Sequence, residues 1–180
     1  MGAILVLFSL MTALGAGAVY ADPDLGKELV RVVKEQIIGN VLDKDPLVLA
    51  SKIFLNNLEV CLFLFLGGAS FGLFTLFIIG VNGLVIGGIV ELAREQQGLL
   101  YVAAAIVPHG ILEIPSFVIA GGLGVVLAEA LWTEWRTGEP GAAEAATAAG
   151  RIFLRIVIPL VALAAIIEAF ITPQILNLVV

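Results

Sequence analysis

The stretch GLLYVAAAIVPHGILEIPSFVIAGGLGVVLAEALW, residues 98–132, decides the class of fold. It is almost wholly apolar, but a proline, a histidine, a glycine and a glutamate interrupt it between residues 108 and 113. A helix needs about 20 residues to cross the hydrocarbon core, so the stretch is too long for one crossing and short for two. We expect a half-helix, a break at 108–110 and a full helix from about Ile111. Broken backbone at membrane depth is tolerated where it is buried in protein or lines a wet cavity.

The whole chain has the composition of such a segment. Of its 180 residues 61% are hydrophobic and 13% are charged, and the mean hydropathy is +1.12. Soluble domains are about half apolar and a quarter charged, so a water-soluble fold would lack the charge to cover its surface. We expect an all-α, polytopic transmembrane helical bundle with broken or re-entrant helices in the middle of the chain. The net charge of −6 gives no general attraction to nucleic acid, and the lipid bilayer of a cell membrane is the expected surrounding.

We expect one membrane domain, residues 1–180, that passes the membrane several times. Its first apolar run has no Lys or Arg before it, whereas a cleaved secretory signal needs a basic start. The polar stretch that follows carries an apolar stripe at helical spacing from Leu25 to a stop at Gly39–Asn40. This predicts an amphipathic helix that lies at the membrane surface or packs on another part of the protein. The expected segments are a first span (3–20), the amphipathic connector (21–52), Gly-rich spans (53–132), a polar connector (133–150) and a last span (151–172).

The Gly-rich part leaves the number of crossings open. Residues 53–81 are long enough for one tilted crossing, whereas 82–92 are too few to span alone. The latter form either a re-entrant half-helix or a helix lengthened through Gln97. Small residues let helices approach closely in lipid, so the glycines predict tight contacts within or between subunits, and a homodimer. The basic residues in both connectors favour a cytoplasmic position for each.

Polar residues at membrane depth are the candidate site. A charge at the bilayer centre costs about 2.5–3.5 kcal/mol, so each such residue needs a partner or a purpose. His109 and Glu113 are four apart, hence on one helix face. They suit either two ligands of one metal or a hydrogen-bonded pair that locks the helix break. Glu168 either completes the site or is hydrated at the interface, and Asn57 and Asn82 either join the site or bridge and cap helices.

Several residue groups occur in an order that resembles a known family. They are Phe54-Leu55-Asn56-Asn57, Asn82-Gly83, Pro108-His109-Gly110-Ile111-Leu112-Glu113 and Ala165-Ile166-Ile167-Glu168-Ala169-Phe170-Ile171-Thr172. This ordered set resembles the stage II sporulation protein M family of multi-spanning membrane proteins, from the first helix to Thr172. The resemblance implies a membrane scaffold like the founding member, which acts in engulfment with peptidoglycan-degrading partners. It implies the fold more directly than an activity.

Three functions fit these residues. The first is a non-enzymatic membrane scaffold or assembly component with a buried polar or metal site and with membrane or cell-envelope protein partners. The second is a transporter or channel for a small solute or ion, with a polar site at the midplane. The third is an intramembrane hydrolase with a divalent metal such as zinc on His109, Glu113 and Glu168. With a single histidine, the chain offers fewer typical zinc ligands than the usual catalytic zinc sites, and it contains no His-Glu-x-x-His motif. An enzyme is therefore the less expected outcome.

Overall fold

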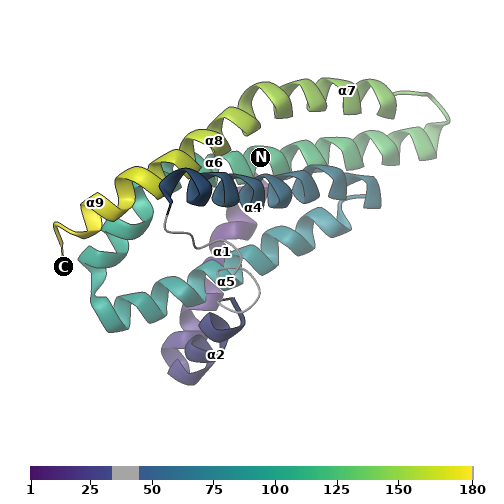
Figure 1. Cartoon of the computed structure of the whole chain (residues 1–180). Helices are drawn as coiled ribbons and strands as arrows, with labels where there is room; N and C mark the ends of the chain where they lie inside the picture. The colour runs from purple at the N-terminus through teal and green to yellow at the C-terminus, as the bar shows by residue number, and fades with distance from the viewer. Residues whose placement is uncertain (34–44, 180) are drawn as a thin grey trace.

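The computed structural model describes residues 1–33 and 45–179, and every regular element in these ranges is a helix (Figure 1). This confirms the expected all-α fold. Gly39–Asn40, the expected stop of the amphipathic helix, lie outside the described residues. In the described part five helical stretches are long and apolar enough to cross a membrane: Gly2–Ala21, Pro46–Ser70, Leu73–Gln97, Leu99–Thr137 and Ala142–Leu176.

The Gly-rich region divides differently from the expectation. Helix α4 (Pro46–Leu66) ends in a 3-10 turn, η2 (Gly67–Ser70), and helix α5 begins at Leu73 and runs to Gln97. Residues 53–81 are therefore not one tilted crossing but the end of one span, a turn and the start of the next. Residues 82–92 reach spanning length as part of α5 rather than as a re-entrant segment. Gly72, with φ of 84°, takes the left-handed conformation that the turn requires.

Residues 98–132 lie in one helical element, α6 (Leu99–Thr137), with Pro108 and Pro115 inside it. Instead of a half-helix followed by a full helix, the chain stays helical across 108–110. Figure 1 shows α6 changing direction near its start. Proline lacks a backbone N–H and kinks a helix, yet neither proline ends α6.

The five candidate spans bear on where the two polar connectors lie. Between the connector after α1 (Gly2–Ala21) and the one after α6 the chain contains three candidate spans, α4, α5 and α6. Three single crossings would bring the chain to the opposite side of the membrane, which differs from the expected cytoplasmic position of both connectors. That position stays a prediction.

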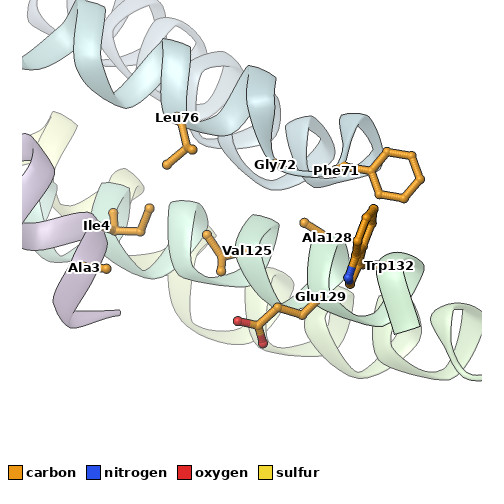
Figure 2. Close-up of a pocket in the computed structure, with 9 residues that line it drawn as sticks. All are labelled: Ala3, Ile4, Phe71, Gly72, Leu76, Val125, Ala128, Glu129 and Trp132. Atoms are coloured by element: carbon orange, nitrogen blue, oxygen red, sulfur yellow. The ribbon is translucent and has the colours of Figure 1, made fainter. Parts of the chain in front are cut away.

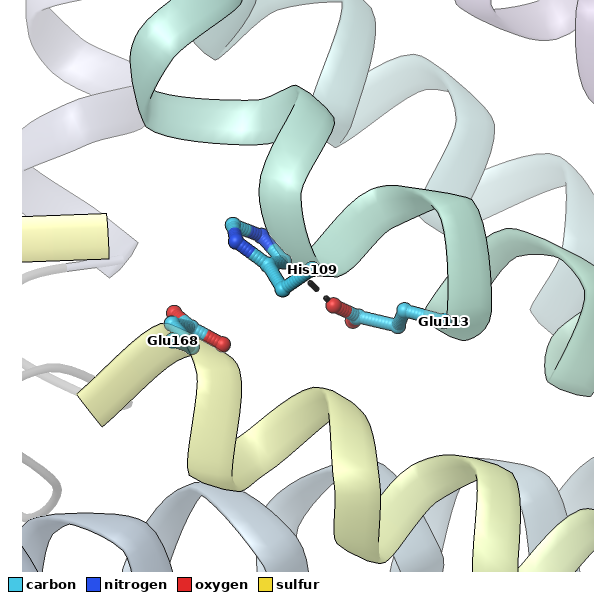
Figure 3. A group of neighbouring side chains, drawn as sticks. All are labelled: His109, Glu113 and Glu168. Carbon is cyan, nitrogen blue, oxygen red and sulfur yellow. Dashed lines mark ion pairs between the residues drawn. The ribbon is translucent and has the colours of Figure 1, made fainter. Parts of the chain in front are cut away.

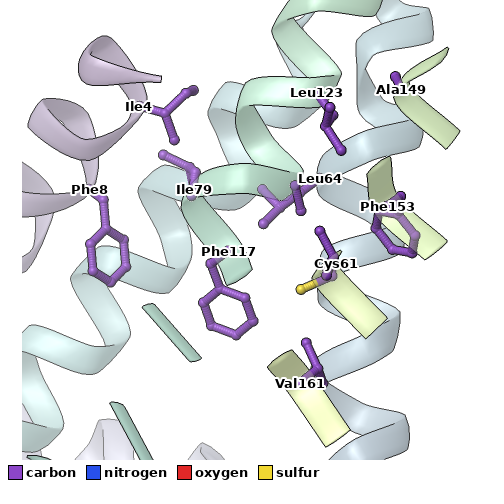
Figure 4. Close-up of a cluster of buried hydrophobic side chains, with 12 residues drawn as sticks. Ile4, Phe8, Cys61, Leu64, Ile79, Phe117, Leu123, Ala149, Phe153 and Val161 are labelled. Carbon is purple, nitrogen blue, oxygen red and sulfur yellow. The ribbon is translucent and has the colours of Figure 1, made fainter. Parts of the chain in front are cut away.

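The last span is one long run of consecutive helical segments with two wide turns. It comprises α7 (Ala142–Ile152), the π-helical segment η3 (Phe153–Val157), α8 (Ile158–Ile166), a second π-helical segment η4 (Ile167–Ile171) and α9 (Thr172–Leu176). In Figure 1 it lies beside α6 along much of that helix. The core forms where this span meets α1, α4, α5 and α6, and Figure 4 shows its side chains, which include Phe8, Leu64, Ile79, Phe117 and Val161.

Glycines bring the helices into close contact inside the chain. A Cβ added at Gly87 of α5 would lie 2.0 Å from the carbonyl oxygen of Thr12 in α1, and one added at Gly68 would lie 2.1 Å from that of Gly124 in α6. Backbones this close require glycine, as in other membrane helix pairs. These glycines therefore serve contacts within one chain, and the homodimer stays a prediction that they do not support.

Thr75 links α5 to α4 beside the Gly68 crossing. It is fully buried, and its hydroxyl donates a hydrogen bond of 2.9 Å to the carbonyl oxygen of Leu64. We expect Thr75→Val to lower the free energy of unfolding by about 0.6–1.7 kcal/mol, the range for hydrogen bonds between membrane helices. Unfolding in micelles by added SDS measures this. Thr147→Val is the control, because that hydroxyl bonds within an exposed face of α7. Equal effects of both would contradict the linking role of Thr75.

Helix α2 (Pro23–Val33) packs over the end of α5. A Cβ added at Gly26 would lie 2.6 Å from Val19 and 3.4 Å from Leu92, so this face of α2 lies against α1 and α5. Leu25 and Val32 remain exposed, while Lys27 pairs with Asp24 and holds the pKa of that carboxyl below its usual range. Apolar and charged side chains on one exposed surface suit a helix at the level of lipid headgroups.

Candidate metal centre

Three ionisable side chains from two spans converge on one point. Helix α6 supplies His109 and Glu113, and η4 in the last span supplies Glu168. One ligand atom from each of the three residues lies within 4.8 Å of the others. Figure 3 shows the three side chains in the space between the two spans. The structure thus brings together three of the five residues that the sequence predicted for the site.

The distance between His109 and Glu113 is compatible with two ligands of one metal. His109 Nε2 lies 3.7 Å from Glu113 Oε2, which is too long for a hydrogen bond. Zinc–ligand distances of about 2.0–2.2 Å place the donor atoms of a tetrahedral site about 3.4 Å apart. The His109–Glu113 separation is close to that value, so a small ion fits between these atoms with little movement of either side chain.

The π-helical turn of η4 shapes the wall opposite α6. In this wider turn the backbone N–H of Thr172 donates to the carbonyl oxygen of Ile167, five residues earlier. The Thr172 hydroxyl donates to the same oxygen at 3.3 Å, and its own oxygen lies 3.5 Å from His109 Nδ1. Single π turns inside helices are frequent at functional sites. Here the turn brings Glu168 and Thr172 to the same imidazole.

A cavity of about 180 Å³ adjoins the cluster between α5 and α6. His109 and Glu113 line it, with exposed side-chain fractions of 13% and 18%. The other described residues of its wall are apolar, among them Ile86, Ile106 and Phe117. The cavity beside the cluster is therefore bounded mainly by apolar side chains rather than by a polar channel.

A larger groove of about 370 Å³ lies between the start of α1, the α4–α5 turn and the second half of α6 (Figure 2). Phe71 and Trp132 meet edge to face at one end, with ring centroids 6.1 Å apart. Among the described residues that line the groove, Glu129 is the one ionisable side chain. One carboxylate cannot assemble a metal site, so the groove is not the candidate centre. Its aromatic end suits the membrane interface.

The two asparagines of the predicted site form hydrogen bonds within their own helices. The Asn82 amide donates to the carbonyl oxygen of Ile78 in its own helix at 2.9 Å. Asn57 is buried in α4, and its side-chain oxygen accepts a hydrogen bond of 3.3 Å from the Asn56 amide. Asn82 lies within α5 and Asn57 within α4, so neither caps a helix end, and these two hydrogen bonds stay within one helix rather than bridging two.

The sequence interpretation missed two hydroxyls around the cluster. Thr172 contacts His109, and Ser116, fully buried, donates to the backbone carbonyl of Glu113 at 2.6 Å. The spacing offered a signal for both, because Thr172 follows Glu168 by one helical turn and Ser116 follows Glu113 by slightly less. Glu91, another acid in the apolar region, is paired with Arg94 through two hydrogen bonds of 2.6 and 2.8 Å, and so needs no further partner.

Five apolar spans around a cluster of ionisable residues define a multi-pass integral membrane protein. The family model described as Stage II sporulation protein M matches residues 4–173, and the chain belongs to this family. The family resemblance found in the sequence is thereby confirmed. The uncharacterized protein MJ0706 of Methanocaldococcus jannaschii is 31% identical over 85 residues, which are 47% of this chain and 36% of that protein. The match thus spans little more than a third of the relative's length. No solved structure matches the chain.

Proposed function

We propose that this protein is a non-enzymatic scaffold of the cell membrane in which a divalent metal ion, such as zinc, joins α6 to the last span. The observation that carries the proposal is the convergence of His109, Glu113 and Glu168 from two spans onto one point. Such an ion acts as a cross-link and fixes the position of the last span. A fixed helical surface is what a scaffold offers to membrane or cell-envelope protein partners, or to a second copy of the chain.

Charge balance supports a metal ion at this point. Two carboxylates this close repel each other when both are ionised, and charge at membrane depth is costly. A divalent ion balances two carboxylates, while a neutral imidazole adds a third ligand without adding charge. The complete cluster is then neutral, which is the state that the apolar surroundings favour.

The surroundings of the cluster favour a scaffold over the two alternatives. A transporter needs a wet path to its site, whereas the wall of the adjoining cavity is apolar apart from His109 and Glu113. A hydrolase can use the coordination position that three protein ligands leave open. Apart from His109 and Glu113, the described residues that line this cavity offer no polar side chain that could orient the bond to be hydrolysed. Liposomes that contain wild type or His109→Ala should therefore show the same low zinc flux.

Elemental analysis of the purified protein tests the proposal. Wild type is expected to carry about one equivalent of a divalent metal, and His109→Ala and Glu113→Ala are each expected to lose it. Glu129→Gln is the matched control, since this exposed carboxylate lies on the same helix outside the cluster. A metal-free wild type after purification without chelators and titration with zinc would refute the metal. Retention by both alanine variants would place the ion elsewhere.

A further inference from the structure

We infer that Thr172 is a positioning residue that holds His109 in the tautomer with its proton on Nδ1, so that Nε2 presents a lone pair to the cation. The inference rests on the proposed metal function of the cluster. The tautomer itself can be measured without metal. The inference is based on two contacts of the Thr172 hydroxyl, one with the carbonyl oxygen of Ile167 and one with the imidazole of His109.

The first step concerns the hydroxyl proton of Thr172. A threonine hydroxyl has one proton to donate and two lone pairs to accept with. That proton is directed to the carbonyl oxygen of Ile167 at 3.3 Å. The backbone N–H of Thr172 donates to the same oxygen because of the π turn. With its proton engaged there, the hydroxyl faces His109 Nδ1 as an acceptor.

The second step concerns the imidazole. A neutral histidine carries one N–H, and its other nitrogen is an acceptor. An acceptor oxygen 3.5 Å from Nδ1 favours the proton on that nitrogen. Nε2 is then unprotonated and faces Glu113 Oε2, another acceptor, at 3.7 Å. Two acceptors that face each other without a shared proton leave a position for a cation. Metal-bound histidines commonly donate their second nitrogen to an outer oxygen in this way.

The wide turn of η4 makes this arrangement possible. Thr172 lies just after the π-helical residues Ile167–Ile171 and is itself only 5% exposed. In a regular α-helix the backbone N–H of Thr172 would donate to the carbonyl oxygen four residues earlier. The carbonyl oxygen of Ile167 would then not accept from both the backbone N–H and the hydroxyl of Thr172. The π turn therefore links the backbone of the last span to the tautomer of a side chain on α6.

The tautomer can be observed directly because the chain contains a single histidine. In protein labelled with ¹⁵N-histidine, the two ring nitrogens are expected to give a protonated Nδ1 and an unprotonated Nε2 in metal-free wild type at neutral to mildly alkaline pH. Thr172→Val keeps the side-chain shape but removes the hydroxyl, and it should shift the ring toward the other tautomer. Thr172→Ser restores the hydroxyl and should restore the wild-type spectrum. Thr147→Val, at an exposed hydroxyl on α7, should change nothing.

Zinc titration against a competing chelator supplies the second measurement. Loss of an outer-shell partner typically weakens metal binding about 10–100-fold, so Thr172→Val should show a loss in this range and Thr172→Ser less than about threefold. A wild-type ring protonated on Nε2, or a Thr172→Val spectrum equal to wild type, would overturn the inference. If the tautomer responds as expected but wild type binds no zinc, the proposed metal function fails while the orienting contact of Thr172 stands.

Discussion

Replacing Gly87 by alanine is expected to lower the free energy of unfolding by about 3 kcal/mol, the upper range for overpacking a tight contact. The added Cβ would lie 2.0 Å from the carbonyl oxygen of Thr12 and 2.9 Å from the backbone nitrogen of Ala16. A backbone cannot rotate aside as a flexible side chain can, so α1 must move away from α5. The movement also separates Phe8 from Gly83 farther along the same crossing. SDS-induced unfolding in micelles, followed by tryptophan fluorescence, measures the loss.

Gly17→Ala on α1 is the matched control for this contact. No atom lies within 4 Å of a Cβ added at Gly17. Alanine is favoured over glycine inside a helix by about 1 kcal/mol, so this variant should be as stable as wild type or more stable. The two glycine-to-alanine changes should thus have opposite signs although both lie in membrane helices. Equal tolerance at Gly87 would contradict the close α1–α5 crossing.

Removal of metal is the other change with a large expected effect. An ion present at about 1,000 times its dissociation constant stabilises the protein that binds it by about 4 kcal/mol. A strong chelator should therefore lower the unfolding midpoint of wild type substantially, and added zinc should restore it. The effect should be greatest on the last span, because Glu168 is the residue by which that span would bind the proposed ion together with His109 and Glu113. Protection of its backbone amides from hydrogen exchange reports on that span separately.

Glu168→Gln separates the metal from other effects of the chelator. This variant keeps the size of the side chain but removes the charged ligand, so chelator should no longer change its unfolding midpoint. Glu129→Gln, on the exposed face of α6, should respond as wild type does. If chelator destabilises Glu168→Gln as much as wild type, the ion does not act through this cluster.

The sequence by itself determined the class of the protein and part of the site. A chain that is 61% hydrophobic and 13% charged cannot cover a soluble surface, and this physical limit holds for any arrangement of the helices. The neighbourhood of His109 and Glu113 was predictable for a local reason, since a spacing of four places two side chains on one helix face. The ordered motifs likewise identified the family that the comparison confirmed.

The tertiary structure alone decided which distant residues meet. Glu168 joins the pair on α6 because the last span packs along that helix, and helix packing depends on side chains far apart in the sequence. The turn between α4 and α5 lies inside an apolar run whose hydropathy gives no boundary, at the point where Gly68 comes close to Gly124 of α6. The contact from Thr172 to His109 depends on a π turn, which has no simple sequence signature. The sequence thus provided the three ionisable side chains in two separate segments, and the packing of α6 against the last span brings them together.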